Sequence, residues 1–174
     1  MDQKEANFSK TVTLITELAG KIYQDIQKTG RKLNAREIKI AKIVGVKNPE
    51  KIRIFSVSAQ DYMSYSVYEK LKLKEWLDVP PIDQIGFVYS YSIILKKERK
   101  LTLANLSRAF RFVTYFESFL KMEYFFQMYI KSIMNFGFQG SPFSIDNKRI
   151  AQTSALLFSL EELEEKQDST QTRS

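Results

Sequence analysis

"RAFRFVTYFESFLKMEYFFQMYIKSIM", residues 108–134, is the stretch on which the predicted fold depends most. It contains six Phe and three Tyr, with Arg, Lys and Glu scattered among them. Apolar residues recur at intervals of three and four, the rhythm of a buried helix face, at Phe110, Val113, Phe116 (or Glu117), Leu120 and Tyr124. We therefore expect one helix that Thr102 or Asn105 opens and that ends near Gly137. It would hold about 33 residues and be roughly 50 Å long.

One stripe of this helix is polar and consists of Ser107, Arg111, Thr114, Ser118 and Lys121. The other positions are mostly large and apolar. A helix that is apolar over so much of its circumference is central to a bundle, or is shared between a core and a partner. Arg111 heads the polar stripe, so its side chain is expected to point away from the core.

The aromatic side chains have three conceivable roles: a core, a membrane anchor, or a platform for nucleic-acid bases. Glu117, Lys121 and Glu123 argue against the membrane, because each charge would cost several kcal/mol there. Base stacking requires exposed aromatics beside basic residues. The tyrosines that meet this condition are Tyr115, near Arg108 and Arg111, and Tyr62, Tyr65 and Tyr68, ahead of Lys70 and Lys72. Packing in a core is favoured for all of them.

The first part of the chain has clear helix signals. One apolar face runs through Phe8, Val12, Ile15, Ala19, Ile22 and Ile26. Gly30 closes that helix. Asn34 with Glu37 three residues later resembles a capping box, and a short basic helix follows that stops near Gly45. Pro49 then suits the first turn of a new element.

Two later segments are ambiguous between helix and strand. In residues 51–77, Ile52, Ile54 and Val57 would suit a strand, but a helical spacing is also kept and no hairpin turn breaks the run. Residues 82–100, "IDQIGFVYSYSIILKKERK", have the same ambiguity. Helix is favoured for both, with a break at Pro80–Pro81 between them.

The C-terminal part is predicted as a loop, a helix and a tail. Residues 137–142, "GFQGSP", form the loop, and Asp146 caps a last helix whose inward residues are Leu157, Leu160 and Leu163. Residues 166–174 form a polar tail that is expected to be disordered. The predicted fold class is therefore all-α: a compact helical bundle of about five to six helices in a single domain, residues 1–165, with one long aromatic-rich helix.

The composition excludes much of enzyme chemistry. The chain has no Cys and no His, so disulfides, thiolate nucleophiles, Cys/His zinc sites and imidazole catalysis are not available to it. No P-loop, GxGxxG or EF-hand pattern is present, and Asp61 and Asp146 are isolated acids. We expect no enzymatic activity, no metal and no cofactor. The N-terminus has no apolar core and no long uncharged apolar segment follows, which predicts a cytoplasmic protein without a membrane span.

The charge is uneven along the chain. Residues 28–53 hold nine basic and two acidic residues, a net charge of +7. A second basic cluster has Glu98 as its one acidic neighbour. It consists of Lys96, Lys97, Arg99, Lys100, Arg108 and Arg111. The C-terminal part is acidic, at Glu161, Glu162, Glu164 and Glu165. Such asymmetry favours a polyanion such as nucleic acid; solvated helix faces and acidic membrane surfaces are the alternatives.

A family resemblance begins at residues 107–126. "SRAFRFVTYFESFLKMEYFF" resembles the C-terminal helix of the small subunits of CRISPR effector complexes, which in type III-A has the form R-F-x-x-Y-x-E-A-x-x-A-Y. Arg111, Phe112, Tyr115 and Glu117 keep that order, and Ser118 and Tyr124 then depart from its spacing. Upstream, "EKIRIFSVSA" (50–59) resembles the family's S-K-I-R-N-L-L helix, and residues 85–100 fall where the family has an apolar helix with a basic end. The resemblance covers residues 48–130. The chain continues some 40 residues past the aromatic helix, so type I-D and type I-A small subunits also come into question.

The resemblance implies a non-catalytic helical bundle that stacks head to tail in several copies. Its implied partners are guide RNA and target nucleic acid, together with the other effector subunits. Basic residues would contact phosphates, while base pairing with the guide reads the sequence. The candidate binding residues are Lys96, Lys97, Arg99, Lys100, Arg108 and Arg111, with Arg36, Lys39 and Lys42 as a second row on one helix.

Two rival functions stay open. The first is an archaeal plasmid or viral helical DNA-binding protein of the helix-turn-helix kind. Its recognition helix would have to lie in residues 34–51, where the polar positions are mostly Lys and therefore poor readers of base edges. The second is a helical enzyme or scaffold that uses carboxylates.

Overall fold

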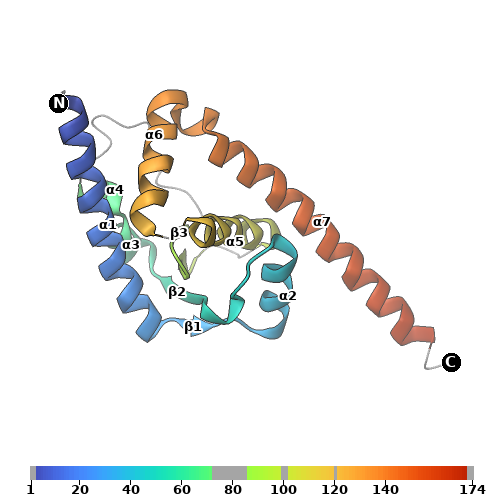
Figure 1. The fold of residues 1–174 in the computed structure, drawn as a ribbon. Coiled ribbons are helices and arrows are strands. Elements are labelled where there is room, and N and C mark those ends of the chain that lie inside the picture. The colour runs from blue at the N-terminus through green and yellow to red at the C-terminus, as the bar shows by residue number, and fades with distance from the viewer. Residues whose placement is uncertain (1–2, 72–85, 99–101, 120, 172–174) are drawn as a thin grey trace.

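The computed structural model describes residues 3–71, 86–98, 102–119 and 121–171 of the chain. Figure 1 shows helices arranged around a small sheet. The elements in chain order are α1 (Gln3–Thr29), β1 (Arg31–Lys32), α2 (Ala35–Val44), the 3₁₀ turn η1 (Pro49–Lys51), β2 (Arg53–Val57), α3 (Ala59–Tyr62), the 3₁₀ turn η2 (Met63–Tyr65), α4 (Val67–Lys70), β3 (Gly86–Tyr89), β4 (Ser92–Lys96), α5 (Leu103–Ser118), α6 (Met122–Gly140) and α7 (Pro142–Gln171).

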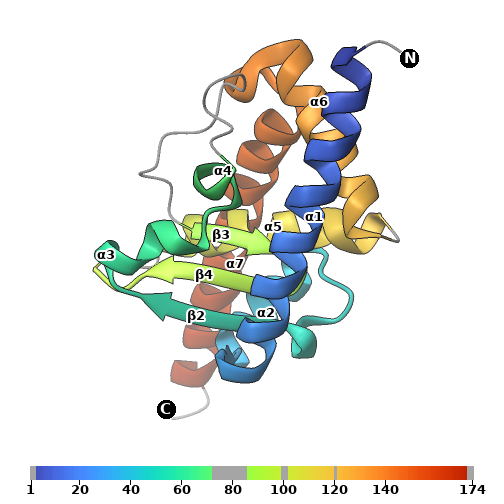
Figure 2. The same ribbon diagram turned by 90° about the vertical axis from the view of Figure 1, so that its left-hand side faces the viewer.

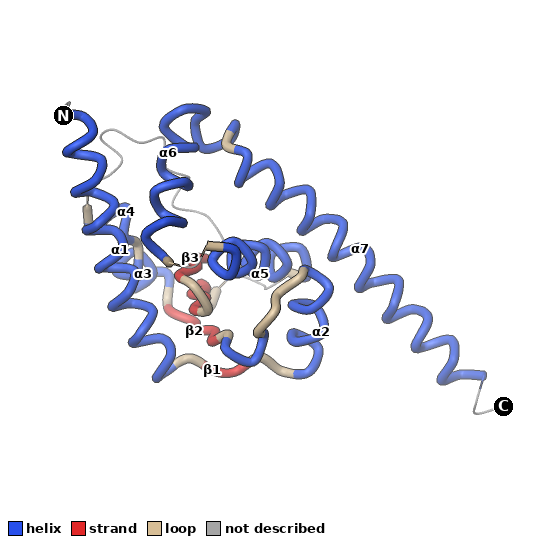
Figure 3. The backbone as a smooth tube through the Cα atoms, viewed as in Figure 1, coloured by secondary structure: helices blue, strands red, loops and turns tan. Residues whose placement is uncertain are grey.

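The four strands form one mixed sheet in the order β1-β2-β4-β3. β2 runs parallel to β4, whereas β1 and β3 are antiparallel to their neighbours. Figure 3 shows the strands in red in the middle of the molecule, with helices on both sides. The prediction of an all-α bundle is therefore wrong: the fold is mostly helical, but a four-stranded sheet lies at its centre.

Both segments that the sequence left ambiguous contain strands. Residues 92–95 of β4 are buried on both faces, so the strand is an unbroken apolar run without the alternation that identifies a half-exposed strand. Tyr89 pairs with Ser92, which leaves a two-residue turn at Ser90–Tyr91. Ser90 has a φ of 55°, a conformation for which Gly or Asn is the usual sequence signal. The helix prediction for residues 82–100 is wrong over the described residues 86–98, because neither of these strand signals was present in the sequence; residues 82–85 and 99–100 lie outside the described residues.

The sheet separates two cores, and Figure 2 shows α1 crossing the strands on one side. The first core joins α1 and α6 to side chains such as Val57, Tyr89 and Ile94. The second joins α2, α5 and Phe158 of α7 to Ile54 and Ile93 of the sheet, and also includes Leu95. Adjacent residues of β4 thus serve opposite cores, as the period of two of a strand requires.

The predicted long helix is broken. α5 ends at Ser118 and α6 begins at Met122, and the backbone is extended at Phe119 and Lys121. The ring centres of Phe116 and Phe125 are 4.0 Å apart, whereas nine residues of a straight helix would separate them by about 13 Å. The break therefore lets two aromatic runs fold onto each other in one core. Leu120, one of the predicted core residues, lies outside the described residues.

Other predictions for this helix had mixed outcomes. Phe110, Val113 and Phe116 are buried, and the Thr102 side chain caps α5 by accepting from the Asn105 N–H, as predicted. Tyr124, however, is exposed.

α7 differs from its prediction in its start and in its inward face. It begins at Pro142, with proline in the first turn, so Asp146 is not its cap. Ser154 and Phe158 are buried, whereas Leu157 and Leu160, which were predicted to face inward, are exposed. The side chain of Leu163, the third predicted inward residue, is not described. The loop predicted for residues 137–142 is present in part: two helical segments of α6 meet across a kink at Gly137, and the backbone is extended at Ser141. α7 continues through Gln171, into the segment predicted as a polar tail.

The N-terminal predictions are confirmed. Val12, Ile15, Ala19, Ile22 and Ile26 are all buried on one face of α1. Gly30 ends the helix, and a Cβ there would lie 2.8 Å from the Cβ of Arg53 and 2.7 Å from the Ile26 carbonyl oxygen. Only glycine lets β1 leave α1 so close to β2.

Candidate nucleic-acid interface

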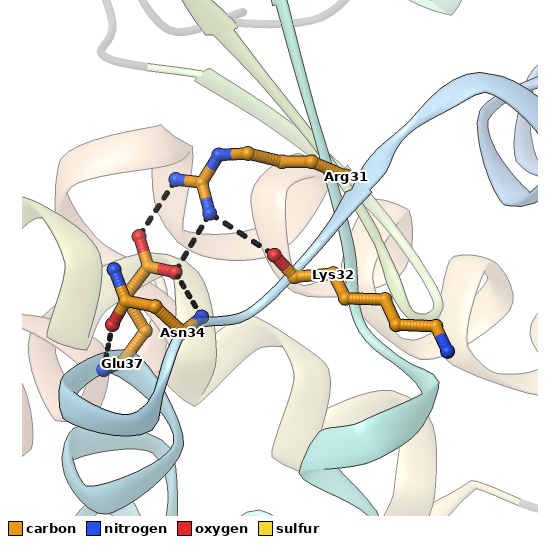
Figure 4. Close-up of polar contacts among 4 residues, drawn as sticks. All are labelled: Arg31, Lys32, Asn34 and Glu37. Carbon is orange, nitrogen blue, oxygen red and sulfur yellow. Dashed lines mark hydrogen bonds and ion pairs between the residues drawn. The ribbon is translucent and has the colours of Figure 1, made fainter.

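The connection from α1 to α2 is built around the Glu37 carboxylate (Figure 4). Arg31 donates to it through both terminal nitrogens, each at 2.7 Å. The backbone N–H of Asn34 donates to the same carboxylate at 2.9 Å, and the Asn34 side chain accepts from the backbone N–H of Glu37 at 2.9 Å. The predicted capping box is therefore present, and Arg31 extends it into a bidentate ion pair.

These contacts set the charge of Glu37. Burial by itself raises the pKa of a carboxyl group, but the hydrogen bonds from Arg31 and from the Asn34 backbone outweigh burial. The pKa of Glu37 is consequently lowered from its ordinary value. The Arg31 guanidinium is thus held by Glu37 in the first turn of α2, although part of the Arg31 side chain is exposed to solvent.

Lys32 and its neighbours are arranged differently. In Figure 4 the Lys32 side chain extends away from the Arg31–Glu37 pair, because successive residues of a strand point to opposite sides. The β1–β2 register places Lys32 beside Arg53. We call Lys28, Lys32, Lys51 and Arg53 the basic edge, since they come from the end of α1, from β1, from η1 and from the start of β2.

The basic edge is open to solvent. Lys28, Lys32 and Lys51 are exposed, and Arg53 is half-buried and donates to the carbonyls of Glu50 and Ile52. Glu50 of η1 is an exposed acidic neighbour. The segment that supplies the basic edge, residues 28–53, nevertheless carries the excess charge of the chain. The whole chain has 27 basic and 20 acidic residues, so after subtracting nine and two for residues 28–53, the remainder holds 18 of each sign.

A second carboxylate, Glu117 of α5, holds the loop beside this edge. It accepts from the backbone N–H groups of Lys47 at 2.8 Å and Asn48 at 2.9 Å, from the Asn48 side chain at 3.2 Å, and from the Tyr91 hydroxyl at 3.0 Å. The Lys51 amine in turn lies 5.6 Å from the centre of the Tyr91 ring. Glu117 thereby orients the loop that carries Lys47 and Lys51. Sequence reasoning missed this role, because its partners are distant in the chain.

The predicted row Arg36, Lys39 and Lys42 is mostly used for packing. Arg36 forms an ion pair with Glu162 of α7 at 2.8 Å, and its guanidinium lies 5.0 Å from the centre of the Phe158 ring. The Lys39 amine is 5.8 Å from the same ring. These two residues fasten α7 to α2. Lys42 is exposed at the other end of the row.

The predicted pair Arg108 and Arg111 is half-buried. Arg111 has a buried Nε, donates to the Thr114 hydroxyl at 3.0 Å and lies 4.6 Å from the centre of the Tyr115 ring. Ser107 and Thr114, its neighbours in the predicted polar stripe, are buried. Ser118 and Lys121, at the end of the stripe, are exposed, so the stripe forms the predicted solvent face only at that end, and Arg111 contributes to packing.

The cluster that begins at Lys96 is only partly described. The Lys96 amine lies 4.6 Å from the centre of the Tyr62 ring, and Lys97 is exposed. Arg99 and Lys100 lie outside the described residues. No described contact joins Lys97 to Arg108 or Arg111, so the convergence of these residues on one face stays a prediction.

The tyrosines singled out for stacking on bases are mainly packed. Tyr62 is fully buried and stacks on Phe87 with ring centres 4.6 Å apart, so it cannot serve as a base platform. Tyr115 is half-buried and packs edge-on against Phe112 and Phe143. Tyr65 packs edge-on against Phe55, and the side chain of Tyr68 is not described. The more exposed Tyr124, 5.7 Å from the Lys121 amine, was not selected from the sequence.

Residues 3–71, 86–98, 102–119 and 121–171 contain neither a candidate metal site nor a candidate membrane span. No three His, Cys, Asp or Glu side chains there come together in a way that could hold a metal ion. No helix in those ranges combines the length and the apolar character that crossing a bilayer requires.

Comparisons with known proteins give no family for the chain. No protein-family model matches it, and neither a curated protein nor a solved structure does.

Proposed function

We propose that this protein is a non-catalytic nucleic-acid-binding protein that contacts phosphates through the basic edge. The observation that carries the proposal is the position of the charge: the whole excess of +7 belongs to residues 28–53, and the β1–β2 register places two of its cations, Lys32 and Arg53, side by side. A cytoplasmic location is part of the proposal.

Three of the four cations of the basic edge are lysines. A lysine ammonium contacts a phosphate as a point charge and carries no fork of donors to match a base edge. Binding of this kind releases counterions and is therefore steeply salt-dependent and nearly blind to sequence. Lys47, whose backbone N–H donates to Glu117, is a further exposed cation of the same segment, residues 28–53.

Membership in a CRISPR interference complex is a narrower hypothesis with guide RNA, target nucleic acid and other effector subunits as partners. It now rests on the aromatic stretch alone. The resemblance implied helices at residues 50–59 and 85–100, and these segments contain β2, β3 and β4. The broader proposal does not depend on it.

The rival helix-turn-helix function would require α2 to enter the major groove. Arg36 and Lys39 of α2 instead pack against Phe158 of α7, and Glu37, Ile40, Ala41 and Val44 are buried. α2 therefore uses two of its basic side chains, Arg36 and Lys39, for packing on α7, where a recognition helix would direct them to bases. This favours phosphate contact by the neighbouring edge over base recognition by this helix.

The test compares two triple variants of equal charge. Lys28→Gln/Lys32→Gln/Lys51→Gln removes three exposed cations from the basic edge, and Lys10→Gln/Lys21→Gln/Lys131→Gln removes three exposed cations from α1 and α6. Fluorescence anisotropy with labelled single- and double-stranded oligonucleotides is measured over a range of salt concentrations. Circular dichroism verifies that both variants are folded.

The edge variant should bind at least about tenfold more weakly, and its salt slope should fall in magnitude by up to about three. The control variant should stay within about threefold of the wild type, because it loses charge but not the phosphate contacts. Equal losses in both variants would show that net charge alone matters, and the proposed interface would be rejected. If the wild type binds no nucleic acid at low salt, the proposed nucleic-acid-binding function is refuted.

Sequence preference and catalysis are checked with the same material. Oligonucleotides of equal length and different sequence should bind with affinities within a few-fold of one another. A hundredfold preference for one sequence would favour the rival helix-turn-helix function. Incubation with Mg²⁺ or Mn²⁺ should leave RNA and DNA intact. Cleavage that a single Asp or Glu substitution abolishes would contradict the non-catalytic assignment.

A further inference from the structure

α7 has apolar residues on two opposite faces, and the rest of the chain covers only one of them. Phe158 is 1% exposed and packs into the second core. Leu156, Leu157 and Leu160 are 62%, 48% and 49% exposed. Figure 1 shows α7 at the edge of the molecule, with its C-terminal part extending past the other elements. The exposed fractions of the three leucines show that the described residues leave this outer face largely open.

The outer face has the spacing of a coiled-coil seam. Positions 149, 153, 156, 160, 163 and 167 follow one another at alternating intervals of four and three, with leucine at 156, 160 and 163. Phe158 occupies the position opposite this seam. A helix that docks on the seam therefore approaches from the side away from the body of the protein.

The charge distribution along α7 indicates what that helix is. Lys148 and Arg149 are exposed and precede the leucines in the sequence. The residues that follow the leucines include Glu164 and Glu165. An antiparallel pair with its two-fold axis near residue 158 places residues 148–152 of one copy beside residues 164–168 of the other. Basic and acidic ends then face each other at both ends of the seam. In a parallel pair, like charges would be adjacent.

We propose that the protein forms a closed two-fold dimer through antiparallel packing of its two α7 helices around Leu156 and Leu160. A head-to-tail stack with the basic edge as the receiving surface fits less well. Among the described residues of 28–53 there is no exposed large apolar side chain to cover the leucines. The seam is short, so the dimer belongs to the small and weak class of interfaces and forms in the micromolar range. The inference is independent of nucleic-acid binding.

The first experiment measures sedimentation velocity of the full chain at increasing protein concentration. The wild type should convert from monomer to dimer and stop there. Leu156→Gln/Leu160→Gln should stay monomeric. The control Met128→Gln/Met134→Gln, which changes two exposed apolar residues of α6, should dimerise as the wild type does. Since all four side chains are exposed, circular dichroism should be unchanged.

A charge-reversal series then tests the orientation. Lys148→Glu/Arg149→Glu and Glu164→Lys/Glu165→Lys should each weaken the dimer about tenfold, and the fourfold variant that combines them should restore it. Only an antiparallel pair is rescued in this way. A wild type that stays monomeric at all concentrations, or that grows into open filaments, overturns the proposal. Dimerisation of the Leu156→Gln/Leu160→Gln variant overturns it as well. Failure of the fourfold variant to recover overturns the antiparallel orientation.

Discussion

Glu37 and Glu117 are two carboxylates with the same task at opposite ends of α2. Glu37 holds the start of the helix through Arg31 and Asn34, partners that lie six and three residues away. Glu117 holds the loop after the helix through Lys47, Asn48 and Tyr91, partners that lie 70, 69 and 26 residues away. The first was predicted from the pattern Asn-x-x-Glu. The second has no pattern, because the fold alone brings its partners together.

Glu117→Ala is expected to have the largest effect on stability. The substitution removes one acceptor from two backbone N–H groups, an amide and a phenol at once, so the free energy of unfolding should fall by about 2–4 kcal/mol. Urea titration measures it. Glu123→Ala, at an exposed position of α6, is the control and should change stability by less than about 0.5 kcal/mol. A loss for Glu117→Ala no larger than that of the control would mean that the loop is held by other contacts.

Glu37→Gln should have a smaller effect that depends on pH. The amide keeps the shape of the cap but loses the ion pair with Arg31, which predicts a loss of about 1–2 kcal/mol at neutral pH. Because the pKa of Glu37 is lowered in the folded state, its stabilisation is present above the unfolded value of about 4.3 and is lost as the pH falls through the folded value. The difference between wild type and variant should therefore shrink in acid. A difference that stays constant from neutral pH to acid would show that the charge of Glu37 is not the cause.

Tyr91→Phe tests the far end of the Glu117 network and should cost about 1 kcal/mol at neutral pH. Burial, followed by the hydrogen bond to Glu117, raises the pKa of Tyr91 to about 12. The associated stability is complete below the unfolded value of about 10 and is lost as the pH rises through about 12. In denaturant titrations over this alkaline range, the free energy of unfolding should fall less steeply with pH for the variant than for the wild type. Some decline should persist, because burial also raises the pKa of Tyr89.

Arg36→Ala should have the smallest effect. The Arg36–Glu162 pair is a surface ion pair, and the stacking on Phe158 adds only a partly exposed contact, so the predicted loss is about 0.5–1 kcal/mol and should decrease with added salt. Lys42→Ala, on the same helix and exposed, provides the matched control and should be nearly neutral. If Arg36→Ala were as harmful as Glu117→Ala, long-range anchoring of α7 would matter more for stability than the loop does.

The candidate interface was only half predictable. The sequence indicated that residues 28–53 carry the excess charge, and the structure places Lys28, Lys32 and Lys51 in solvent. Charge counting could not separate these lysines from Arg36 and Arg111, which pack on Phe158 and Tyr115. A cation and an aromatic ring far apart in sequence reveal their contact only after folding.

The sequence alone determined the features that depend on residues close together in the chain. These are the apolar face of α1, which follows from helical spacing, and three helix ends whose hydrogen bonds close within one turn: the stop at Gly30, the capping box at Asn34 and the cap at Thr102. Tertiary structure decided the rest. β2 and β4 became strands because each could pair with the other and because β4 is buried on both faces, an outcome that a short apolar run does not signal. Likewise α5 and α6 separate because Phe116 and Phe125 gain more by packing in one core than by continuing one helix. Local hydrogen bonding is encoded in neighbouring residues, whereas strand pairing and aromatic packing depend on which distant segments meet.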